Sequence, residues 1–121
     1  FKKRWGRIGD SPVIGAGTYA DNNSCAVSCT GHGEYFIRHA VANNLCARVK
    51  YLKETVDKAA EAIIFNELNE KEGNGGLIAV DKDGNIAMTF NSGGMFRGYL
   101  YKEQGKTSVK KGVGIGKLMS K

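Results

Sequence analysis

The sequence predicts an α+β fold in which helices are layered on a largely antiparallel sheet. Two consecutive stretches, 34–49 and 55–68, carry apolar residues at three- and four-residue steps, the period of amphipathic helices. Short apolar runs at 25–29, 77–80 and 86–90 predict strands. Asp83-Gly84 between the last two runs is a favoured hairpin pair, so we expect these two strands to be antiparallel neighbours.

The N-terminal part of the chain is predicted to be irregular up to the first strand. Two glycines and a proline interrupt 6–12, which is typical of a loop. Residues 15–20 fit the dinucleotide pattern G-x-G-x-x-A, but Asp21-Asn22-Asn23 turns the chain at once and no helix pattern follows. We therefore exclude a nucleotide site there. The run 25–29 is apolar with little alternation, which predicts a strand buried on both faces.

The two helical stretches and the strands after them have recognisable boundaries. The first stripe is predicted to be one helix from Glu34 to Val49. Thr55 is a suitable N-cap for the second helix, and Gly73 is its predicted end. The strand predicted over 77–80 follows a glycine pair, and a further strand is expected over 96–101.

Length and composition indicate one soluble globular unit or part of one. The chain has 121 residues, 41% of them hydrophobic and 25% charged. No apolar run approaches the length of a membrane span. The first residue is Phe1 rather than methionine, so we expect the true start to lie upstream and residues 1–121 to form a single partial domain.

Charge and cysteine content exclude some functions. Residues 102–121 form a basic, glycine-spaced tail with six lysines and one acidic residue. Because no aromatic residues are interleaved with these lysines, we interpret the tail as a solvated end, without a nucleic-acid partner. The three cysteines, Cys25, Cys29 and Cys46, lack metal-finger spacing with either histidine. We expect no metal and no cofactor, and three buried, reduced thiols, which favour a cytoplasmic location.

The chain is organised around the turn that follows the first predicted strand. The strand ends at Thr30, glycines stand at 31 and 33, and a helix pattern begins at Glu34. Unpaired amides at such a helix start suit a carboxylate or a developing oxyanion. From the spacing alone, however, a strand-to-helix turn without a ligand is the favoured interpretation.

Five motifs follow one another along the chain: G-R-I-G-D-S-P at 6–12, G-A-G-T-Y-A-D-N at 15–22, A-V-S-C-T-G-H-G-E at 26–34, G-G-L-I-A-V at 75–80 and F-N-S-G-G-M at 90–95. Together they resemble the β subunit of the plant-type asparaginase and isoaspartyl peptidase family. The resemblance implies part of a four-layer αββα N-terminal-nucleophile hydrolase sandwich, built by an α and a β subunit that self-cleavage releases from one precursor. It also implies an (αβ)2 assembly.

The resemblance assigns substrate-binding roles to residues of these motifs. Arg7 matches the arginine that binds the substrate's α-carboxylate, a role suited to a bidentate guanidinium. Asp10 matches the residue that takes the α-ammonium, together with the carbonyl of Gly33. Thr30 and Gly31 match the oxyanion hole, through a hydroxyl and a backbone N–H.

Three further residues lie inside these loops and are expected to shape the substrate site: Ile8, Gly9 and His32. A catalytic role for His32 would need an acidic residue to orient its ring. Glu34 is only two residues away on a turn, which is a poor geometry for that purpose. We therefore interpret His32 as a loop side chain.

The resemblance implies hydrolysis of L-asparagine and β-aspartyl dipeptides by an N-terminal threonine, whose own α-amine acts as the base. In the family pattern this threonine would lie ahead of Phe1, so we expect this chain alone to be inactive. The sequence T-G-H-G-E followed by Phe36-Ile37-Arg38 favours the asparaginase branch. The alternatives are a glycosylasparaginase-type amidase and an inactive fragment with no catalysis of its own.

Overall fold

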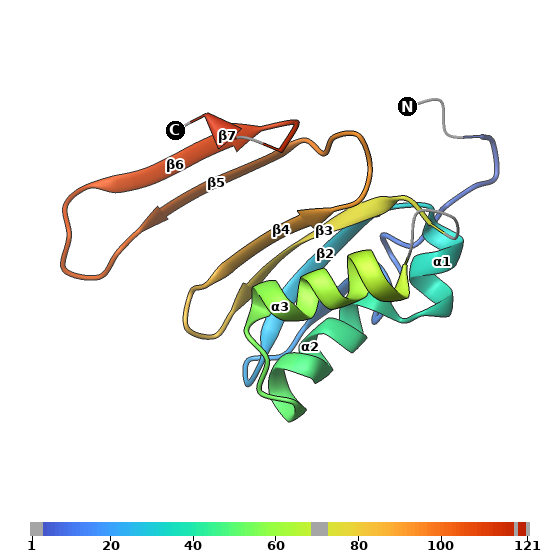
Figure 1. Cartoon of the computed structure of the whole chain (residues 1–121), viewed down its shortest axis with the longest axis horizontal. Helices are drawn as coiled ribbons and strands as arrows, with labels where there is room; N and C mark the ends of the chain where they lie inside the picture. Colours follow the sequence, from blue (N-terminus) through green and yellow to red (C-terminus); the bar gives the residue numbers. More distant parts are fainter. Residues whose placement is uncertain (1–3, 69–72, 118, 121) are drawn as a thin grey trace.

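A computed structural model of the chain describes residues 4–68, 73–117 and 119–120. It contains a main sheet of four strands, a layer of helices on one face of that sheet, and a separate three-stranded sheet (Figure 1). The predicted α+β class is confirmed. Among the described helices none is long and apolar enough to cross a membrane.

The main sheet is antiparallel throughout and follows the chain order β1-β2-β3-β4. Its predicted strands are confirmed, whereas the short first strand was not expected. The register places Thr30 opposite Gly76 and Gly31 opposite Gly75. The strands are β1 Thr18–Ala20, β2 Cys25–Gly31, β3 Gly75–Asp81 and β4 Ile86–Phe90.

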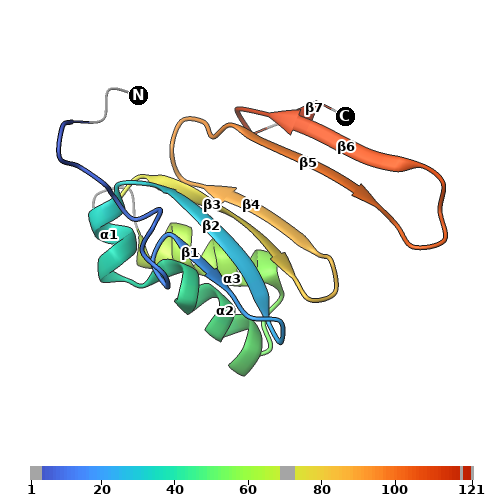
Figure 2. The ribbon, with the colours of Figure 1, turned by 180° about the vertical axis from the view of Figure 1, so that it is seen from behind.

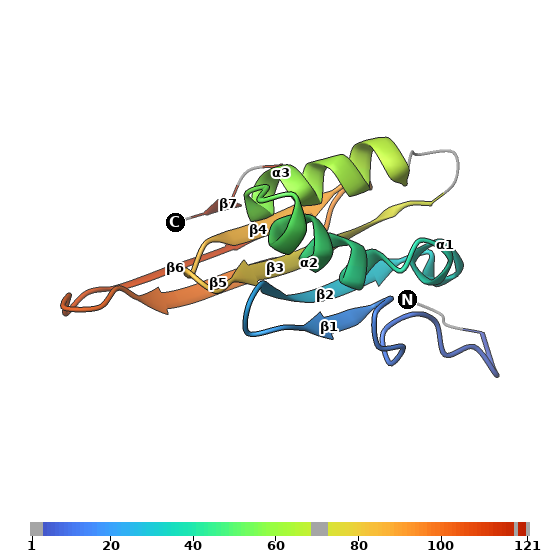
Figure 3. The same cartoon turned by 90° about the horizontal axis from the view of Figure 1, so that it is seen from below.

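Helices α2 and α3 pack on the same face of the main sheet (Figures 1 and 3). The helices are α1 Gly33–Arg38, α2 Val41–Tyr51, α3 Val56–Glu61 and the π-helix η1 Ala62–Glu67. The core lies between this layer and the sheet, because the apolar stripe of each helix faces the inward side chains of the strands. Its fully buried large side chains include Phe36, Leu45, Ile63, Ile64 and Leu77.

The first predicted helix is in fact two helices. The chain breaks at Ala40, which adopts the left-handed conformation with φ 45°. The first amides of α2 then bond outside the helix: Ala42 N–H donates to the carbonyl of Ala16 and Asn43 N–H to that of Gly15, at 3.0 and 2.8 Å. The N-terminal loop therefore caps α2, and the helix starts again there without a glycine or proline to mark the break.

The second predicted helix begins as expected and ends earlier. The Thr55 hydroxyl accepts a hydrogen bond from Lys58 N–H at 3.4 Å, so the predicted N-cap is confirmed. α3 continues into η1, which ends before Leu68 rather than at Gly73. Residues 69–72, over which the prediction extended the helix, lie outside the described residues.

Burial on both faces of β2 was predicted wrongly. Cys25, Val27 and Cys29 are buried against the helices, but the side chains between them are exposed. The helix layer covers one face of the main sheet, and no described helix covers the other (Figure 2). On β3 that open face presents Ile78 and Val80, which are 44% and 42% exposed.

The C-terminal part forms a second antiparallel sheet, which we call the hairpin sheet. It consists of β5 Arg97–Lys102, β6 Val109–Gly114 and β7 Met119–Ser120. The strand expected over 96–101 is confirmed as β5. The tail interpreted as a solvated end is mostly exposed, but it contains β6, which the sequence did not predict. Gly112 leaves room for the ring of Tyr99 opposite it, because a Cβ there would lie 2.6 Å from Cε1 of that ring.

Candidate functional site

The candidate site is built around the turn between β2 and α1. Gly31 has φ 144°, a conformation that side chains other than glycine rarely adopt. A Cβ at this position would lie 2.4 Å from the carbonyl oxygen of Asn74 and 2.6 Å from the Cα of Gly75. Gly31 is therefore needed for the close approach of the neighbouring strand's backbone.

His32 fixes the same turn to the chain that enters β3. Its backbone N–H donates to the carbonyl of Asn74 at 2.9 Å. Its ring Nδ1 accepts a hydrogen bond from the Asn74 N–H at 3.3 Å. Both contacts are with backbone groups, so in this structure the imidazole takes part in holding the loop.

Arg7 reaches from the N-terminal loop to the first turn of α1. Its guanidinium forms an ion pair with Glu34, and both side chains are about half exposed. The pKa of Glu34 is lowered, first by a hydrogen bond from its own backbone N–H and then by the Arg7 guanidinium. The pair therefore orients Arg7 beside the turn, while part of the guanidinium stays open to solvent.

Asp10 is buried, with 4% of its surface exposed. Two glycines make room for it. A Cβ on Gly17 would lie 2.3 Å from the backbone oxygen of Asp10, and a Cβ on Gly33 would lie 2.8 Å from its nitrogen and 3.0 Å from Oδ1. The loop at Asp10 is thus clamped between the second and third sequence motifs.

The structure brings most of the predicted site residues into one region, where the N-terminal loop passes α1 (Figure 2). Arg7 and Asp10 both contact the first turn of α1, at Glu34 and Gly33. Thr30 and Gly31 lead into that turn from β2. Between the two loop contacts, the side chain of Ile8 is 70% exposed, and Gly9 has φ 86°.

Sequence reasoning missed Asn91, although it lies in a motif that matched the family. Its side chain bonds to the backbone at Gly75, opposite Gly31. The available signal was the position of Asn91, directly after a predicted strand and before Ser92-Gly93-Gly94. An asparagine at such a place commonly bonds to nearby backbone groups.

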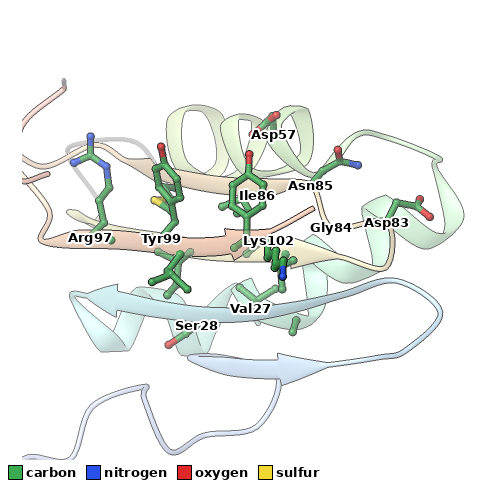
Figure 4. A pocket seen from close by; sticks show the side chains of 18 of the residues that line it. Val27, Ser28, Asp57, Asp83, Gly84, Asn85, Ile86, Arg97, Tyr99 and Lys102 are labelled. Carbon is green, nitrogen blue, oxygen red and sulfur yellow. The ribbon is translucent and has the colours of Figure 1, made fainter. Parts of the chain in front are cut away.

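A groove lies elsewhere, between the main sheet and the hairpin sheet (Figure 4). Val27 and Ser28 of β2 line one part of it, and Arg97 and Tyr99 of β5 another. None of the predicted substrate-binding residues is among the described residues that line this groove. The groove is therefore separate from the candidate site.

The cysteines differ from the expectation of three reduced thiols. Cys25 and Cys46 form a disulfide that joins β2 to α2, with their Cα atoms 5.4 Å apart. Cys29 is free and buried, and burial, followed by the charge of Asp10, raises its pKa to about 12. The cytoplasmic location rested on reduced thiols and loses that support. No group of His, Cys, Asp and Glu side chains within the described residues is arranged to hold a metal ion.

The motifs and the geometry agree with comparison to known proteins. A family model described as asparaginase matches residues 1–109, nearly the whole chain. The chain belongs to this asparaginase family, and the resemblance seen in its motifs is confirmed.

Similar proteins include two bacterial isoaspartyl peptidases and a plant relative. The isoaspartyl peptidase of Salmonella typhimurium is 50% identical over 96 residues, 79% of this chain and 31% of that protein. The isoaspartyl peptidase of Escherichia coli is 46% identical over 112 residues, which cover 84% of this chain and 35% of that protein. The probable isoaspartyl peptidase/L-asparaginase 2 of Arabidopsis thaliana is 49% identical over 98 residues, which cover 81% of this chain and 29% of that protein. The chain spans about a third of the length of these relatives.

Proposed function

We propose that this chain is part of the β subunit of an amidohydrolase that cleaves L-asparagine and β-aspartyl dipeptides. The observation that carries the proposal is the clamped loop, which sets Arg7 and Asp10 against the turn that follows Thr30 and Gly31. The family supplies the reaction class. The names of the relatives, isoaspartyl peptidase and L-asparaginase, favour this branch over a glycosylasparaginase.

In this proposal each residue has a distinct task. Arg7 binds the substrate's α-carboxylate, and the five N–H donors of its guanidinium allow it to keep Glu34 at the same time. Asp10 and the carbonyl of Gly33 bind the α-ammonium. Thr30, through its hydroxyl, and Gly31, through its N–H, stabilise the oxyanion as negative charge builds up on the carbonyl oxygen. The nucleophilic threonine lies outside this chain.

The open face of the main sheet supports the proposed assembly. Ile78 and Val80 are apolar and nearly half exposed there, on a face that a sandwich fold would cover with a second sheet. We propose that the remainder of an αββα sandwich, including the α subunit of the same precursor, packs against this face. A pair of such αβ units would form the (αβ)2 assembly. A cytoplasmic location remains a prediction, now without support from the thiols.

The test compares Arg7→Ala with Arg38→Ala in the full-length protein that contains this chain. Arg38 lies at the other end of α1 and stacks over Tyr35, so its loss is the matched control. Losing one charge-assisted contact in a half-exposed site costs about 1.5–3 kcal/mol, roughly 10- to 100-fold in kcat/KM for asparagine. An amide without the α-carboxylate should lose little. Ammonia release measures both.

Equal losses on the two substrates would show that Arg7 is structural. No ammonia release from the unmodified full-length protein would favour the inactive alternative. The 121-residue chain by itself is expected to release none, because the proposed nucleophile lies outside it.

A further inference from the structure

Asn91, the residue that follows β4, gathers several backbone segments around one amide group. Its Oδ1 accepts the N–H of Gly75 at 2.8 Å, and its own backbone N–H donates to the carbonyl of Gly75 at 3.0 Å. Its Nδ2 lies near three carbonyl oxygens, those of Ile64 at 3.2 Å, Leu68 at 2.8 Å and Gly73 at 3.1 Å.

This arrangement requires both halves of a primary amide. An amide NH2 has two N–H donors, so with three carbonyls in reach one N–H is shared between two of them, while the amide oxygen accepts the Gly75 N–H. Ile64 lies in η1 and Leu68 is its C-cap residue, close to a helix end, where backbone carbonyls run out of helical N–H partners. Asn91 therefore ties the end of η1 to the start of β3.

The start of β3 in turn holds the turn of the candidate site. Gly75 lies opposite Gly31, and a Cβ on Gly75 would lie 2.4 Å from the carbonyl oxygen of Thr30. The preceding residue, Asn74, accepts the backbone N–H of His32 at 2.9 Å. The Asn74–Gly75 segment thus lies between Asn91 on one side and the turn on the other.

We propose that Asn91 is a positioning residue for the oxyanion site, acting through Gly75 on Thr30 and Gly31. The inference rests on the function proposed above for Thr30 and Gly31. Asn91 sets the register and depth of the β3 start, against which the turn packs without room for a Cβ. Catalytic donors tolerate little displacement, and a shift of about 1 Å can cost about 100-fold in rate.

The experiment uses Asn91→Asp in the full-length protein. The substitution keeps the size and the acceptor for Gly75 N–H, but it places a second oxygen against the three carbonyls. We expect kcat for asparagine to fall by roughly 10- to 100-fold, with KM changed by less than about threefold, because Arg7 and Asp10 are held by other contacts.

The matched control is Asn85→Asp, the same substitution at the opposite end of the β3–β4 hairpin. The Asn85 amide donates to Asp81 Oδ2 at 2.8 Å, so this variant also loses a side-chain hydrogen bond and gains a charge. It should lower the melting temperature and leave kcat unchanged. A variant Asn91→Ser, which removes the amide without adding charge, carries the same test if Asn91→Asp melts below the assay temperature.

Thr30→Val, measured in parallel, separates the two proposals. A low kcat in Thr30→Val and Asn91→Asp, with normal kcat in Asn85→Asp, supports both. A low kcat in Thr30→Val with normal kcat in folded Asn91→Asp overturns the positioning role alone. Normal kcat in Thr30→Val overturns the proposed oxyanion role, and with it the basis of the inference. If Asn91→Asp changes KM and leaves kcat normal, the positioning role is also overturned.

Discussion

Gly17→Ala tests the clamped loop without reference to catalysis. Gly17 is buried against Asp10, and an added Cβ would lie 2.3 Å from the Asp10 carbonyl oxygen, 2.5 Å from its carbonyl carbon and 2.8 Å from Oδ2. Two of these atoms are backbone, so no flexible side chain can swing away. The loop at Asp10 must move for the methyl group to fit.

The magnitude follows from two opposing effects. Overpacking in a tight site costs typically about 1–3 kcal/mol. A Gly→Ala change also restricts the unfolded chain, which stabilises the protein by about 0.4–1 kcal/mol. Gly93→Ala isolates the second effect, because nothing lies within 4 Å of a Cβ there and its φ is not positive. The difference between the two variants therefore reports the clash.

The assay is thermal melting of both variants beside the unmodified protein. At this chain length 1 kcal/mol corresponds to a shift of about 4 °C. Gly17→Ala should therefore melt about 4–12 °C below Gly93→Ala. Melting temperatures within about 1 °C of each other would show that Asp10 does not pack on Gly17, and the geometry described for the candidate site would be wrong.

Two further predictions concern the disulfide and a carboxylate. Reducing the Cys25–Cys46 disulfide, whose cysteines are 21 residues apart in the sequence, should lower the free energy of unfolding by about 3 kcal/mol in denaturant titrations. Alkylation of all three cysteines in denatured protein that was not reduced would contradict the disulfide. Burial by itself would raise the pKa of Asp81, but the hydrogen bonds from Asn85 outweigh burial. The pKa therefore lies below its ordinary value of 3.8. The stability that the Asp81 carboxylate contributes should thus be present above pH 3.8 and lost as pH falls through the lowered pKa. Thermal melts at several pH values measure this loss, and the Asp81→Asn variant should not show it.

Local signals predicted those elements that local physics determines. The stripe after Thr55 and the Asp83-Gly84 turn carry their own start and turn residues, and both appear in the structure as expected. The break at Ala40 carries no such residue. It depends on carbonyls of the distant loop at 15–16, which no period within the helix reveals.

The candidate site shows the same division. From residue types alone, Arg7 and Asp10 suggest only a surface ion pair of little worth. The structure instead buries Asp10 between glycines and pairs Arg7 with Glu34. The Arg7–Glu34 and Asp10–Gly33 contacts join segments more than 20 residues apart, so family motifs could indicate them but spacing could not. The Cys25–Cys46 pairing was missed for the same reason.

Phe36 connects the core to the turn. Removing its ring should destabilise the protein both because the ring is buried and because it packs against the paired glycines. The ring is fully buried, and it lies where a Cβ on Gly75 or Gly31 would meet it, at 2.7 and 3.0 Å. Phe36 therefore fills the space that the two glycines leave open. Phe36→Ala should lower the unfolding free energy by about 3–5 kcal/mol, because a cavity opens beneath the paired glycines.

Phe65 provides the control, since it is the same residue type in η1 but is 54% exposed. Phe65→Ala should change stability by about 0.5 kcal/mol or less. Urea titration of both variants measures the difference, and Phe36→Leu, with an expected cost of about 1.5 kcal/mol or less, extends the series if Phe36→Ala does not fold. Similar losses for Phe36→Ala and Phe65→Ala would mean that Phe36 does not support the glycine pair, and that the turn is held by its backbone hydrogen bonds alone.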